Sequence, residues 1–69
     1  MKLGECHKRL LTNACVRAGV PIGTQTARRL QALRREGLVM FDPVIPVYFD
    51  GDWRWFYVVT DEGMEARRA

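Results

Sequence analysis

The sequence predicts a small α+β domain in which helices come first and a two-stranded β-hairpin follows. Apolar residues recur with helical spacing over residues 4–18 and again over residues 24–36. From about residue 44 to residue 59 the chain is rich in β-branched and aromatic residues, which favour strands. With 69 residues in total, residues 1–69 are expected to form a single domain.

The first predicted helix covers residues 4–18. Thr12 and Asn13 in its middle are both good N-caps, so the segment can also be two short helices hinged there. Residues 19–23 follow, with a glycine at each end and Pro21 between them, and proline cannot continue a helix. This stretch is predicted to be a turn.

The second predicted helix carries an apolar stripe and a block of arginines. Thr24 is its expected N-cap, and Gly37 is expected to end it. Ala27, Leu30 and Leu33 lie on one stripe at helical spacing, which leaves the opposite face to glutamine and arginine. A helix of this kind can pack on a core and still present hydrogen-bond donors to a negatively charged partner.

The hairpin is predicted from Asp50-Gly51, a strong two-residue turn signal between two β-rich runs. Both faces of such a ribbon are apolar, which is more than a lone hairpin needs. After it, Thr60 is expected to cap a short C-terminal helix. The expected cross-strand pairs are Tyr48 with Trp53, Val47 with Arg54, Pro46 with Trp55, and Ile45 with Phe56.

Charge is distributed unevenly along the chain. Eleven Lys and Arg face eight Asp and Glu, for a net charge of +3 and a pI near 9.3, a balance that favours polyanionic partners. Most acids lie outside the second helix, which holds four arginines. These are Arg28, Arg29, Arg34 and Arg35.

The two cysteines and the absence of long apolar runs bear on location. Cys6 and Cys15 are too few for a disulfide framework, and on one helix they would lie about 13 Å apart, beyond bridging distance. The chain shows no signal-peptide pattern and no run long enough to span a bilayer. A soluble, cytoplasmic protein without membrane contact is therefore expected.

Three segments resemble the winged helix-turn-helix family of DNA-binding domains, which includes the MarR-like and GntR-like regulators. Residues 14–20 look like the first helix and turn of the motif, residues 26–39 like its recognition helix and exit, and residues 60–63 like the end of its wing. The resemblance implies a small winged helix-turn-helix with a hairpin wing, acting as a transcriptional regulator on double-stranded DNA.

The resemblance also implies which side chains meet DNA. The start of the second helix would face base edges in the major groove, while later arginines and one in the wing would contact phosphates. The carboxylates of Asp50 and Asp52 at the wing tip would be repelled by phosphates. The expected DNA-binding residues are Thr24, Gln25, Thr26, Arg28, Arg29, Gln31, Arg35 and Arg54.

A second hypothesis assigns the same scaffold to protein binding. Arginine-rich helices are often only solvated faces, and Trp53, Trp55 and Tyr57 are expected to serve the core, a homodimer or a larger protein such as a polymerase. A homodimer is favoured because a chain this short buries a marginal core. The aromatic hairpin is then the partner-binding element.

Catalysis and metal binding have little support in the sequence. The chain has one histidine, no glycine-rich phosphate loop and no nucleophile with a recognisable base. Cys6, His7 and Cys15 lack a fourth ligand at metal-site spacing. We therefore expect neither an enzyme nor a cofactor or metal site.

Overall fold

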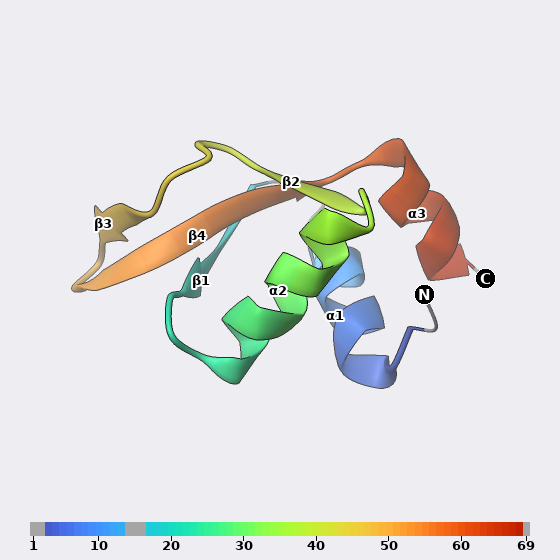
Figure 1. Cartoon of the computed structure of the whole chain (residues 1–69), viewed down its shortest axis with the longest axis horizontal. Coiled ribbons are helices and arrows are strands. Elements are labelled where there is room, and N and C mark those ends of the chain that lie inside the picture. Colours follow the sequence, from blue (N-terminus) through green and yellow to red (C-terminus); the bar gives the residue numbers. More distant parts are fainter. Residues whose placement is uncertain (1–2, 14–16, 69) are drawn as a thin grey trace.

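The chain forms a small α+β fold with three helices and an antiparallel four-stranded sheet (Figure 1) within the residues that the computed structural model describes, 3–13 and 17–68. Helices α1 and α2 lie on one side of the sheet, and α3 follows the end of the longest strand. In chain order the elements are α1 (Glu5–Asn13), β1 (Ala18–Pro21), α2 (Gln25–Arg35), β2 (Val39–Phe41), β3 (Val47–Phe49), β4 (Asp52–Val59) and α3 (Asp61–Arg68).

Strand β4 is the centre of the sheet. At Tyr57 it pairs with Ala18 of β1 and with Phe41 of β2, so these two strands lie on opposite sides of it. At Arg54 it pairs with both β1 and β3, which places β3 on the same side as β2. All these pairings are antiparallel, and β1 forms one edge of the sheet.

The expected first helix is too long. It ends at Asn13, near the alternative hinge, and Ala18 already belongs to β1; residues 14–16 lie outside the described part of the chain. Of the stretch predicted as a turn, residues 19–21 belong to strand β1, and residues 22–23 form a turn as expected. Gly19 makes the strand possible, because a Cβ there would lie 2.8 Å from the ring of Phe56.

The hairpin is confirmed at its tip and corrected farther from it. Tyr48 pairs with Trp53 and Val47 with Arg54 as expected, and the turn residues Asp50 and Gly51 both have positive φ. The Asp42 N–H still donates to the Phe56 carbonyl oxygen (2.9 Å), and residues 43–46 then leave the sheet, since Pro43 and Pro46 have no N–H to donate to a ladder. Trp55 and Phe56 pair instead with Val20 and Gly19.

Three of the expected helix boundaries are confirmed by hydrogen bonds. The Thr24 hydroxyl accepts from the Ala27 N–H (3.1 Å), as an N-cap of α2 should. Gly37 has a φ of 76° and its N–H donates to the Arg34 carbonyl (3.0 Å), which closes the helix. The Thr60 hydroxyl accepts from the Gly63 N–H (3.1 Å) and so caps α3.

The core lies between α1, α2 and the β2 end of the sheet. The Tyr57 hydroxyl, inside it, donates to the Leu10 carbonyl oxygen (2.8 Å), and burial raises the pKa of this phenol. No helix in the described segments has the length and apolarity to cross a membrane. The buried core residues are Leu10, Leu11, Val20, Ala27, Leu30, Leu33, Val39, Phe41 and Tyr57.

Candidate functional site

Helix α2 is oriented by its apolar stripe. Ala27, Leu30 and Leu33 are all buried against the sheet and α1, as predicted. Because a helix has 3.6 residues per turn, the side chains on the opposite stripe must then point outward. Arg28 and Arg35 are accordingly exposed. The core therefore fixes which arginines the helix presents to solvent.

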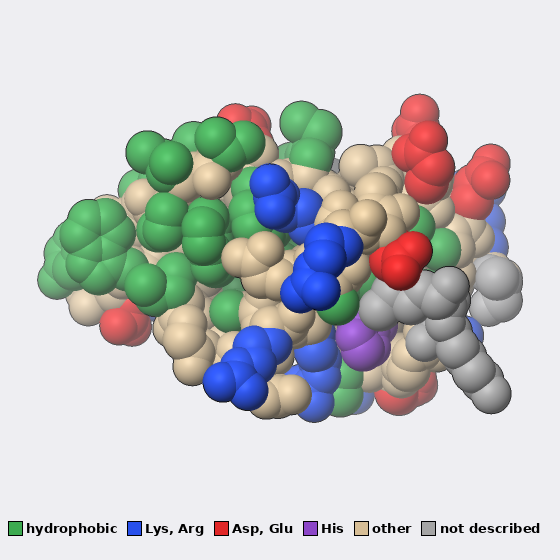
Figure 2. All heavy atoms as spheres, viewed as in Figure 1, with side chains coloured by type: hydrophobic (Ala, Val, Ile, Leu, Met, Phe, Trp, Pro, Cys, Tyr) green, Lys and Arg blue, Asp and Glu red, His purple; other side chains and the backbone are tan. Residues whose placement is uncertain are grey.

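Positive charge predominates on this helix, and the nearest acid along the chain is Glu36, the C-cap residue that follows it. Between residues 17 and 35 the charged residues are five arginines, and the segment contains no Asp or Glu. Within residues 3–13 and 17–68, no arginine of α2 forms an ion pair, whereas Arg54 pairs with Asp52 at 3.8 Å. Figure 2 shows basic side chains over α2. This surface is suited to a polyanion.

The four arginines of α2 point in different directions. Arg28 and Arg35 face solvent opposite the core. The Arg34 guanidinium lies over the Phe41 ring, 5.3 Å from its centroid, in a cation–π contact toward β2. Arg29 is half-buried and faces α1. Arg34 is nevertheless exposed, as Arg28 and Arg35 are, so Arg29 is the arginine of α2 that is held back from solvent.

The remaining residues expected on α2 divide between the surface and its margin. Gln25 is exposed near Arg28, whereas Thr26 and Gln31 are half-buried. Thr24 donates its hydroxyl hydrogen to the Pro21 carbonyl (2.8 Å) and accepts from Ala27, so its hydroxyl is engaged by the backbone. Among these four, Gln25 is the polar side chain with the freest access to a partner.

Arg54 does not join this surface. Successive side chains of a strand point to opposite faces, and Tyr57 and Trp55 face the helices, so Arg54 lies on the other face of the sheet. Its side chain is 21% exposed, and its Nε donates to the Phe49 carbonyl oxygen (3.1 Å). The expectation that Arg54 acts with the basic helix is corrected by this placement.

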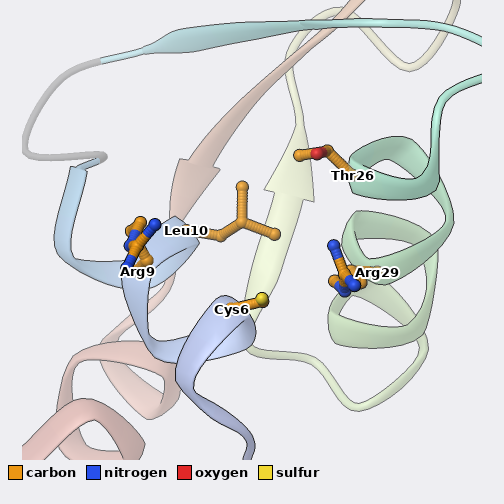
Figure 3. Close-up of a pocket in the computed structure, with 5 residues that line it drawn as sticks. All are labelled: Cys6, Arg9, Leu10, Thr26 and Arg29. Atoms are coloured by element: carbon orange, nitrogen blue, oxygen red, sulfur yellow. The ribbon is translucent and has the colours of Figure 1, made fainter.

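A groove between α1 and α2 was not predicted. Its volume is about 280 Å³, and Figure 3 shows side chains of both helices around it. The two helices meet only in the folded chain, so no local pattern marks their shared groove. The lining residues are Cys6, Arg9, Leu10, Thr26 and Arg29.

Apolar side chains gather at the hairpin end of the molecule (Figure 2). Trp53 is 53% exposed and packs edge-to-face on Tyr48, with ring centroids 5.5 Å apart. Trp55 is half-buried and stacks on Phe41 at 4.8 Å. The exposed large apolar residues are Ile22, Met40, Val44, Ile45, Tyr48, Phe49 and Trp53.

Tyr57 is a correction to the expected partner-binding set. Its side chain is 1% exposed and hydrogen-bonded inside the core, so no partner can reach it. Cys6 is an exposed free thiol, and Cys15 lies outside the described residues. In residues 3–13 and 17–68, no three side chains of the metal-ligating types come together.

Comparisons with protein-family models, with curated proteins and with solved structures found no match for this chain.

Proposed function

We propose that this protein binds double-stranded DNA through the outward face of α2. The observation that carries the proposal is the exposure of Gln25, Arg28 and Arg35 on a helix whose arginines make no ion pairs within residues 3–13 and 17–68. With 11 residues, α2 is about 16 Å long, and a major groove about 12 Å wide admits one helix. The protein then acts as a small transcriptional regulator.

Each side chain on this face has a role in the proposal. Gln25, at the start of the helix, would make a bidentate contact with adenine, and Arg28 one with guanine. Arg35, near the other end of the helix, would bind a backbone phosphate. Sequence discrimination then comes from the first turn, and much of the affinity from the phosphates.

The winged helix-turn-helix family is part of the proposal. The resemblance implies a basic helix that ends at a glycine and is followed by a hairpin, and the elements occur in this order. The chain departs from it before α2, where β1 stands in place of the expected helix and turn. The exposed carboxylates of Asp50 and Asp52 argue against a wing that enters a DNA groove.

A salt titration with duplex DNA tests the proposal. Because each phosphate that Arg35 or another arginine neutralises adds about −0.9 to the slope, log K should fall as log salt rises, measured by fluorescence anisotropy. The double variant Arg28→Gln/Arg35→Gln should weaken binding and flatten this slope. The control is the double variant Arg54→Gln/Arg68→Gln, which also removes two positive charges, but at positions outside α2. Absence of binding at low salt, or equal losses in both double variants, would refute the proposal.

Protein binding by the hairpin is a second candidate function, favoured by the exposed aromatic pair Tyr48 and Trp53. Either a second copy of this chain or a larger protein would cover it. Sedimentation velocity over a range of concentrations tests the homodimer. Wild-type protein should self-associate, and Trp53→Ala should remain monomeric. A monomer at every concentration would exclude the homodimer and leave a larger protein as the partner to seek.

A further inference from the structure

We infer that the groove between α1 and α2 is a phosphate-binding site, occupied by a backbone phosphate when the protein is on DNA. The phosphate chemistry rests on the groove itself. The identification of its usual occupant with DNA rests on the proposed function. The site adds α1 to the interface, although no residue of α1 was expected to contact DNA.

Two arginines from different helices line this groove. Figure 3 shows Arg9 and Leu10 coming from α1 and Thr26 and Arg29 from α2. Within residues 3–13 and 17–68, neither arginine forms an ion pair. A volume of about 280 Å³ is well above the roughly 30 Å³ that one water occupies in the liquid, so a phosphate group has room.

The donors around the groove match a phosphate. A guanidinium carries five N–H donors in a planar fork that binds phosphate oxygens in pairs, and a threonine hydroxyl can donate one more hydrogen bond. Arg9, Arg29 and Thr26 therefore offer donors from both walls. Leu10 contributes an apolar surface beside them, which lowers the local dielectric and strengthens the charge interaction.

A neighbouring depression provides the contrast. It shares Arg9 with the groove and is also lined by Lys8 and Arg67, but it carries Glu5, whose carboxylate would repel an anion. No Asp or Glu lines the groove between α1 and α2. Of these two hollows, the one between the helices is thus the one without a carboxylate in its lining.

The groove lies where it could hold a DNA phosphate while α2 contacts the same DNA. Arg29 follows Arg28 in the same helix, so a phosphate held by Arg29 lies beside the face that would enter the major groove. Arg9 would hold the same phosphate from α1. Clamping one phosphate between two helices fixes the angle at which α2 meets the duplex, which is how backbone contacts set register.

Charge removal in α1 is the first test. Arg9→Gln should weaken DNA binding about tenfold, the loss expected for one charge-assisted hydrogen bond, and reduce the salt slope by about 0.9. Arg68→Gln is the matched control, because Arg68 is exposed at the end of α3 and lines neither hollow. An Arg9→Gln loss no larger than that of Arg68→Gln would overturn the inference.

Cys6 supplies a local reporter, because its exposed thiol lines the same groove. Trypsin separates Cys6 from Cys15, since lysine and arginine lie between them, so alkylation by iodoacetamide can be followed at each residue by mass spectrometry. Saturating duplex should slow alkylation of Cys6 in wild-type protein. An unchanged Cys6 rate in a saturated DNA complex contradicts the site.

Inorganic phosphate separates the two proposals. If the wild-type protein fails to bind DNA but phosphate slows Cys6 alkylation, and does so less in Arg9→Gln, the groove is a phosphate site and the DNA function is wrong. If the wild-type protein does not bind DNA and phosphate leaves the Cys6 rate unchanged, both fail. If DNA binds without changing Cys6 reactivity or depending on Arg9, only the groove assignment fails.

Discussion

The two ends of β4 carry similar aromatic side chains in opposite surroundings. Tyr57 and Trp53 point to the same face of the sheet, because they are four residues apart on one strand. Tyr57 is 1% exposed and Trp53 is 53% exposed. The helices cover the Tyr57 end, while the hairpin extends the molecule to 35 Å along its longest axis. An aromatic side chain of β4 is therefore buried where the helices pack over it and exposed where they do not, whatever its residue type.

The largest expected difference in stability between substitutions at the two ends comes from a core residue of the helices. Leu33 is fully buried, so Leu33→Ala should lower the free energy of unfolding by about 2–5 kcal/mol through lost transfer energy and a cavity. Urea denaturation followed by circular dichroism measures this. Ile45→Ala at the hairpin end is the control and should change stability by at most about 0.5 kcal/mol. Equal losses would mean that the hairpin is as much a part of the core as α2.

A substitution at Gly63 tests how closely α3 packs at the end of the sheet that the helices cover. A Cβ on Gly63 would collide with the Leu38 carbonyl oxygen and lie 2.7 Å from Val59 Cγ1. Gly63→Ala should therefore destabilise the protein by about 1–3 kcal/mol, although alanine is the better helix former. Thermal unfolding checks the sign, with Glu65→Ala at an exposed position of the same helix as control. A stabilised Gly63→Ala variant would show that α3 packs loosely.

The Tyr57 hydroxyl should contribute less, and in a pH-dependent way. Tyr57→Phe removes the bond to the Leu10 carbonyl and should cost about 1 kcal/mol at neutral pH. Burial raises the folded-state pKa of Tyr57 above the ordinary value of 10.0, so its contribution is complete below that pH and is lost as pH rises through the folded-state pKa.

Urea denaturation of wild-type protein and Tyr57→Phe at neutral and alkaline pH measures this effect. The stability difference between the two proteins should shrink above pH 10.0. Tyr48→Phe changes the exposed tyrosine of the hairpin and should leave the pH dependence intact. A constant difference across the pH range would contradict the assignment.

The smallest effect on stability is expected at the hairpin end. Trp53→Ala removes an edge-to-face contact with Tyr48 and should cost about 0.5 kcal/mol. Trp55→Ala should cost distinctly more, because its ring is half-buried and stacks on Phe41. Chemical denaturation of both variants compares them. Similar losses would show that the hairpin tip is cooperative with the core.

The sequence predicted the parts of this protein that are decided locally. The bounds of α2 follow from Thr24 and Gly37, and its buried stripe from the spacing of Leu30 and Leu33, all within one helix length. The hairpin tip follows in the same way from Asp50-Gly51. Capping, periodicity and turn conformation depend on residues a few positions apart, which a linear pattern contains.

The tertiary structure alone decided β1, the burial of Tyr57 and the groove between α1 and α2. The hydrogen bonds of β1 come from β4, more than thirty residues away, so its glycine and proline resembled only a turn. Arg9 and Arg29 line one groove from two helices that pack only after folding. Which arginines face solvent and which line a groove depends on these long-range contacts, because neighbouring elements, and not residue type, determine what each side chain meets.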